Sequence, residues 1–83
     1  MKTSNYMAKP NTKIKLSDHS TDNTAGIKSK DDAKELLEKN IEKMIKLQDK
    51  LYASDKYSLL LIFQAMDAAG KDSTIKHVMS GLN

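Results

Sequence analysis

The sequence predicts an α/β fold, and three observations support this prediction. An apolar run from Leu59 to Phe63 is too short for a buried helix and matches a strand covered on both faces in a parallel sheet. Helical patterns lie before and after this run. A turn of small residues that ends in Gly70-Lys71 indicates a phosphate-binding loop between the strand and the second helix. The predicted order is therefore helix, strand, loop and helix, behind an extended N-terminal arm.

The first 28 residues predict an extended or disordered arm, because they are polar, contain Pro10 and Gly26, and have neither helical nor strand periodicity. Residues 1–30 carry six lysines against two aspartates, so the formal net charge of +3 lies in the arm. Such an arm can contact polyanions or a neighbouring subunit, although an arm solvated over its own domain is the simpler expectation. Tyr6 alone is no stacking platform, and no nucleic-acid partner is expected.

Residues 30–53 follow a helical pattern that Ser29 can cap. Acidic residues stand in its first turn, and two i,i+4 pairs in the better orientation are expected, Glu35 with Lys39 and Glu42 with Lys46. The apolar stripe can form a dimer contact, or it can pack against the chain's own sheet. Packing against the sheet is favoured, because the stripe is broader than a coiled-coil seam. The stripe consists of Ala33, Leu37, Ile41, Met44, Ile45, Gln48 and Tyr52, widened by Leu36, Leu47 and Leu51.

Small side chains in the turn leave room for backbone N–H groups to converge on an anion. The helix that opens near Lys71 adds the positive end of its dipole, and Lys71 adds a mobile charge. The turn departs from the general pattern G-x-x-x-x-G-K-[ST] at Ala65, in place of the first Gly, and at Asp72, in place of Ser or Thr. The hydroxyls of Ser73 and Thr74 lie within one turn of the metal-ligand position of that pattern.

The second helix places its apolar residues on one side, which is most simply a buried face. These residues are Ile75, Val78, Met79 and Leu82. His77 and His19 have no second ligand at metal-binding spacing, so both are interpreted as surface histidines.

The run from Met66 to Lys76, with Asn83 further on, resembles the Walker A segment of the polyphosphate kinase 2 family. In that family, D-A-A-G-K followed by a small or acidic residue, another small residue and I-K is the local signature. Ala65 and Asp72, which are anomalous in the general pattern, fit this one. The resemblance extends roughly from Ile27 to Asn83.

The resemblance implies a P-loop kinase-like parallel α/β/α sandwich, with the arm at 1–28 and the start of a phosphotransferase domain at 29–83. It implies a cytoplasmic enzyme that is a homo-oligomer at full length. The implied activity is transfer of the terminal phosphate of inorganic polyphosphate to a nucleoside mono- or diphosphate, with magnesium (Mg2+). Asp67 and Lys71 would be catalytic, and Asp67 and Ser73 would hold the metal. The phosphate-binding residues would be Ala68, Ala69, Gly70, Lys71, Asp72, Ser73, Thr74 and Lys76.

One predicted strand cannot make a parallel sheet, and no Walker B aspartate or lid follows it in the sequence. We therefore expect an N-terminal piece of a larger protein that is inactive alone. Cysteine is absent and no apolar run reaches membrane-spanning length, so neither a disulfide framework nor a membrane is expected. Two alternatives stay open: another P-loop nucleotide kinase that uses ATP, and a non-catalytic helical interaction segment.

Overall fold

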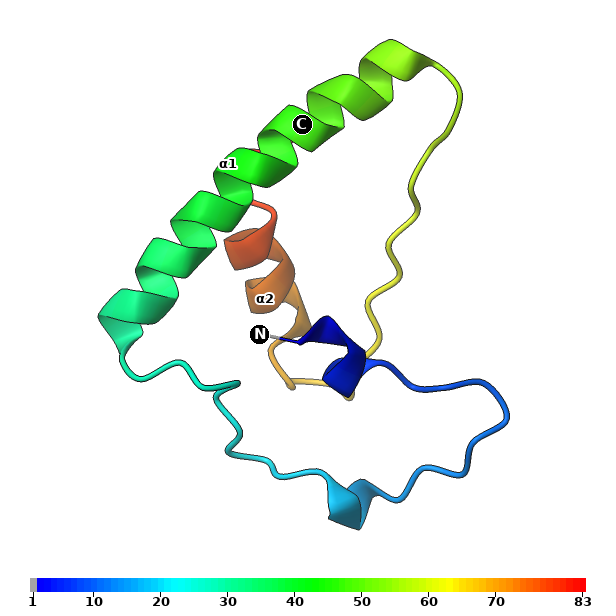
Figure 1. Cartoon of the computed structure of the whole chain (residues 1–83), viewed down its shortest axis with the longest axis vertical. Coiled ribbons are helices and arrows are strands. Elements are labelled where there is room, and N and C mark those ends of the chain that lie inside the picture. Colours follow the sequence, from blue (N-terminus) through cyan, green and yellow to red (C-terminus); the bar gives the residue numbers. More distant parts are fainter. Residues whose placement is uncertain (1) are drawn as a thin grey trace.

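Helix α1 (Lys30–Ser54) is the longest element of the computed structural model, which describes residues 2–83. A second helix, α2 (Lys71–Val78), lies beside it (Figure 1). Two short 3-10 helices, η1 (Thr3–Tyr6) and η2 (Leu16–Asp18), interrupt an otherwise irregular arm. An extended segment returns from the far end of α1 to the turn that precedes α2 (Figure 1).

The ends of α1 are those that the sequence predicts, to within one residue. The Ser29 side chain accepts a hydrogen bond from the Asp32 backbone N–H at 3.1 Å, and Asp31 and Asp32 lie in the first turn. The helix ends where Asp55 adopts the left-handed conformation (φ 50°) and donates its N–H to the Tyr52 carbonyl. The predicted N-cap is confirmed.

One of the two predicted pairs on α1 forms, between Glu35 and Lys39, whereas no ion pair between Glu42 and Lys46 is found in residues 2–83. The Lys39 ammonium lies 2.6 Å from a Glu35 carboxylate oxygen. The hydrogen bond from Lys39 lowers the pKa of Glu35, and the same bond raises the pKa of Lys39. Both groups face solvent, so water screens the pair and its effect on folding is small.

One face of α1 packs against α2 and the residues after it. A Cβ added at Gly81 would lie 3.7 Å from side-chain atoms of both Ile41 and Ile45, so the backbone there runs close to α1. Leu36, Leu47 and Tyr52, which the sequence predicts to belong to the stripe, are instead exposed. The half-buried residues of this contact are Ala33, Leu37, Ile41, Met44, Ile45, Gln48 and Leu51 from α1, with Ile75, Val78, Met79 and Leu82.

The strand predicted at 59–63 is not present, so the α/β class is not confirmed by the part of the chain that the structure describes. A strand needs a neighbouring strand to receive its backbone hydrogen bonds, and residues 2–83 provide none. The segment still has two sides. Leu60 and Ile62 are each 82% exposed, whereas Leu61 is 49% and Phe63 40% exposed. Leu59 and Leu61 line a hollow of about 270 Å³ with residues of α1, including Met44 and Leu51.

Gln48 joins the middle of α1 to the residues that follow α2. Its side-chain oxygen accepts the Asn83 backbone N–H at 3.0 Å, and its side-chain nitrogen donates to the Asn83 carbonyl. A primary amide has one donor and one acceptor group, so it can pair with both the N–H and the carbonyl of one residue, as a residue of a neighbouring β-strand does. Gln48 therefore gives a polar anchor within a face that is otherwise apolar.

Residues 2–83 contain no fully buried side chain. The chain exposes 8402 Å², whereas a compact protein of 9.3 kDa would expose roughly 5,000 Å². The apolar faces are thus covered only in part. None of the helices in residues 2–83 has an apolar stretch that could cross a bilayer.

We expect Gln48→Ala to lower the free energy of unfolding of the full-length protein by about 1 kcal/mol, because a typical intramolecular hydrogen bond contributes about that much net. Urea denaturation measures this loss, and amide hydrogen exchange should be faster at Asn83. The control is Asn40→Ala, which changes an exposed polar residue of α1 for which no side-chain hydrogen bond is found in residues 2–83. Unchanged protection of the Asn83 amide would contradict the anchoring role.

Candidate phosphate-binding site

A tight turn connects the extended segment to α2. The Ala69 N–H donates to the Met66 carbonyl at 3.1 Å, which closes a four-residue turn. Ala68 holds a φ of +59° and Gly70 a φ of +84°. Glycine adopts this left-handed region at no steric cost, whereas alanine there is strained by roughly 1–2 kcal/mol. The strained Ala68 lies inside the predicted loop, where backbone strain is characteristic of functional turns.

The first turn of α2 presents backbone donors. Gly70 is the N-cap and gives no side-chain cap. The first intrahelical bond runs from the Thr74 N–H to the Gly70 carbonyl at 2.9 Å. Within residues 2–83 the N–H groups of Lys71, Asp72 and Ser73 have no acceptor. Three free amides at the positive end of a helix dipole are suited to bind an anion.

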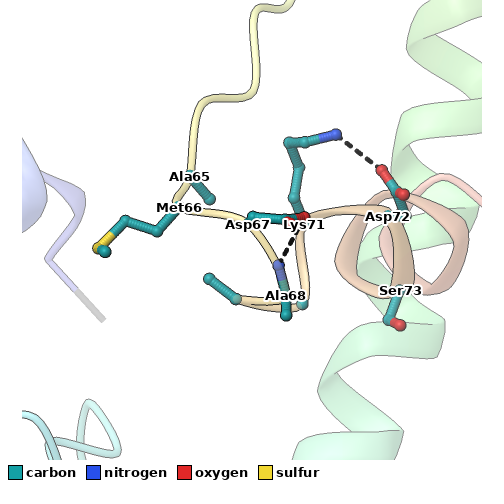
Figure 2. Close-up of a pocket in the computed structure, with 9 residues that line it drawn as sticks. Ala65, Met66, Asp67, Ala68, Lys71, Asp72 and Ser73 are labelled. Atoms are coloured by element: carbon teal, nitrogen blue, oxygen red, sulfur yellow. Dashed lines mark hydrogen bonds and ion pairs between the residues drawn. The ribbon is translucent and has the colours of Figure 1, made fainter.

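These residues surround an open hollow of about 500 Å³ (Figure 2). The hollow is large enough for a phosphate group, and its walls are mostly small side chains and backbone. The predicted turn before Lys71 is therefore present, and α2 does not extend into it. The lining residues are Ala65, Met66, Asp67, Ala68, Ala69, Gly70, Lys71, Asp72 and Ser73.

Lys71 lines the hollow, but its charge is paired. Its ammonium lies 2.7 Å from an Asp72 carboxylate oxygen, and Figure 2 shows the Lys71 side chain reaching toward Asp72. The Asp72 side chain is 92% exposed, so the pair is open to water. Sequence reasoning assigned Lys71 to the anion and did not predict that its own neighbour would hold it.

Asp67 is also engaged within the turn. Its carboxylate accepts the Ala68 N–H at 3.0 Å (Figure 2), a bond that ties the side chain to the loop backbone. A carboxylate in an anion-binding loop repels its ligand unless a cation lies between them. The position of Asp67 beside the hollow therefore suits a ligand that brings a metal ion.

The structure brings together most, but not all, of the predicted site residues. Thr74 and Lys76 do not line the hollow, and the Thr74 hydroxyl donates to the Gly70 carbonyl at 2.9 Å. Thr74 thus holds the start of α2, while Ser73 is among the residues that line the hollow. Met66 also lines the hollow, although the sequence did not predict it as a site residue. It is exposed in the turn, and no motif position or spacing in the sequence marks it as a lining residue.

The histidine of α2 lies away from this hollow. His77 and Ser80 line a separate depression with residues of α1, such as Lys30 and Leu37. Residues 2–83 contain no group of three or more His, Cys, Asp or Glu side chains placed to hold a metal. The structure therefore gives His77 no role at the loop.

Residues 27–83 match the family described as Polyphosphate kinase 2 (PPK2). The chain is also 43% identical, over 83 residues, to an ADP-polyphosphate phosphotransferase of Rhodopseudomonas palustris; the match covers 100% of this chain and 29% of that protein. An AMP/ADP-polyphosphate phosphotransferase of Meiothermus ruber is 37% identical over 79 residues, which is 94% of this chain and 30% of that protein. The chain thus spans less than a third of the length of these curated relatives. No solved structure matches it.

We expect Gly70→Ala in the full-length protein to weaken pyrophosphate binding about fivefold, because a Cβ at positive φ costs about 1 kcal/mol in the conformation that aims the α2 amides. The added Cβ meets no atom within 4 Å, so the effect is conformational and not a clash. Isothermal titration calorimetry measures it.

Gly26→Ala is a matched control, since Gly26 has φ +79° and equally open surroundings in the arm. Equal affinity for the two variants would argue against a role of the Gly70 conformation in binding.

Proposed function

This chain belongs to the polyphosphate kinase 2 family, and we propose on that basis that the full-length protein transfers the terminal phosphate of inorganic polyphosphate to a nucleoside mono- or diphosphate. The observation that carries the proposal is the hollow at residues 65–73, where three unpaired amides and a lysine meet at a helix N-terminus. The names of the two relatives, which specify ADP or AMP/ADP as well as polyphosphate, support the substrate classes.

In phosphoryl transfer the protein contributes mainly by positioning the reactants and by offsetting charge on the transferred oxygens. The free N–H groups at the start of α2 are fixed by the helix and need no rearrangement to meet phosphate oxygens. Lys71 has a flexible stem, so its ammonium can leave Asp72 and follow the phosphate. We assign Lys71 and Asp67 to the catalytic step.

Magnesium fits the donor set of the loop. The carboxylate of Asp67 and the hydroxyl of Ser73 are oxygen donors, which Mg2+ prefers. Mg2+ is usually held by one or two carboxylates together with substrate phosphates and water, so no ready-made protein cage is needed. When bound, the ion would offset negative charge on the phosphate oxygens. We propose that Asp67 and Ser73 bind the Mg2+ ion together with the phosphate groups of the substrate.

The other predicted contacts take distinct parts in this proposal. The backbone of Ala68, Ala69 and Gly70 shapes the hollow, and Asp72 and Ser73 contribute amides. Thr74 supports the start of α2 through Gly70. Lys76, in the last turn of α2, is proposed as a more distant contact for the polyphosphate chain.

We also propose that the protein acts in the cytoplasm as a homo-oligomer. The absence of cysteine fits a reducing compartment, and exposed apolar residues such as Leu47 and Tyr52 on α1 give surface for a second subunit. Under this proposal residues 1–28 are an N-terminal arm outside the enzyme domain, and the enzyme domain begins at residue 29.

We expect Lys71→Ala to lower kcat/KM for phosphate transfer from polyphosphate by about 100-fold or more, because removing one group that stabilises charge on the transferred phosphate costs this much. A coupled assay of nucleotide formation by the full-length protein measures the loss. Lys30→Ala is the matched control, since Lys30 also occupies the first position of a helix and precedes an aspartate. An unchanged rate for Lys71→Ala would remove Lys71 from the mechanism.

The same assay separates the proposal from a P-loop kinase that uses ATP. Polyphosphate and ATP are offered together as donors, with only one of them labelled in its transferable phosphate. We expect the label in the product to come from polyphosphate. Product labelled from ATP alone would overturn the assignment of the donor, although the anion-binding loop would still be required.

A further inference from the structure

The charged side chains of the loop do not favour a polyanion. Asp67, Lys71 and Asp72 are the charged residues among those that line the hollow, so the lining carries a net formal charge of −1. The backbone amides attract phosphate, but the side chains as a group repel it. A ligand that arrives with its own cation avoids this repulsion.

Asp72 adds to this effect by occupying the lysine. The Lys71 ammonium and the Asp72 carboxylate are 2.7 Å apart at the edge of the same hollow. A phosphate group must therefore compete with Asp72 for Lys71. Because exposed ion pairs are weak, a polyanion can win this competition, but the freed carboxylate then remains beside it.

We propose that Asp72 is a specificity-determining residue that makes the loop discriminate against metal-free polyphosphate and in favour of its Mg2+ complex. The inference rests on the proposed function and deepens it. Without a metal, the polyphosphate chain must both displace Asp72 from Lys71 and tolerate its charge. With Mg2+ on the phosphates, the cation lies between the ligand and the freed carboxylate and offsets the repulsion.

The sequence around the loop explains why this property belongs to Asp72. The general P-loop pattern has a neutral hydroxyl directly after the lysine, at the position that Asp72 fills here. A hydroxyl neither pairs with the lysine as an ion nor repels a bare phosphate. The substitution thus changes the charge of the loop without removing its backbone donors.

The test is isothermal titration calorimetry of tripolyphosphate with the full-length protein, at constant ionic strength, in EDTA and in excess Mg2+. We expect Asp72→Asn and Asp72→Ser to bind metal-free tripolyphosphate about three- to tenfold more tightly than the unsubstituted protein, the range expected when an exposed ion pair and a nearby like charge are removed. Binding in Mg2+ should change by about twofold or less, since the cation already offsets that charge. The preference for the metal complex therefore falls.

Asp31→Asn is the matched control, because Asp31 is the second residue of α1 as Asp72 is of α2, and each follows a lysine. It removes the same charge from the same helix position away from the hollow, and its preference for the Mg2+ complex should equal that of the unsubstituted protein. Circular dichroism checks that the variants fold, as the exposure of Asp72 predicts.

Two negative results have different meanings. If the unsubstituted protein binds tripolyphosphate and Lys71→Ala weakens that binding, but the Asp72 variants keep the original preference for the metal complex, the inference about Asp72 is overturned and the proposed function stands. If the unsubstituted protein binds tripolyphosphate in neither condition, the proposed function fails and the inference fails with it.

Discussion

The left-handed backbone at Gly70 is the constraint on which the rest of the site depends. It ends the turn that begins at Met66 and starts α2, so that the first amides of the helix face the hollow and not another carbonyl. The hydrogen bond from the Ala68 N–H to the Asp67 carboxylate stabilises the turn on one side, and that from the Thr74 hydroxyl to the Gly70 carbonyl stabilises it on the other. Lys71 and Asp72 reach the edge of the hollow only because the helix starts there.

The position of α2 depends in turn on α1. Contact between the Gly81 backbone and the isoleucines of α1 is apolar and tolerates sliding, whereas the paired hydrogen bonds of Gln48 with Asn83 have one geometry. A nonspecific contact and a specific anchor thus act together. Their combined effect is to orient a helix of only eight residues, which has little stability of its own.

Local features were predictable from the sequence, and long-range ones were not. The limits of α1 follow from Ser29 and the periodic stripe, and the bend follows from small residues before Gly70. The strand at 59–63 was predicted from hydrophobicity, but strand formation requires a pairing partner that hydrophobicity does not supply. The Lys71–Asp72 pair depends on side-chain conformation, and the Gln48–Asn83 bonds join residues 35 positions apart. Neither has a signature in the spacing of residues.

The segment Leu59–Phe63 has a consequence for how this chain must be handled during its synthesis. Five consecutive apolar residues are extended, largely exposed, and free of strand pairing within residues 2–83. Unpaired extended backbone with such side chains is a template for aggregation with other nascent chains. The tendency to aggregate lasts until another part of the protein covers the segment, so early burial of Leu59–Phe63 during folding limits it.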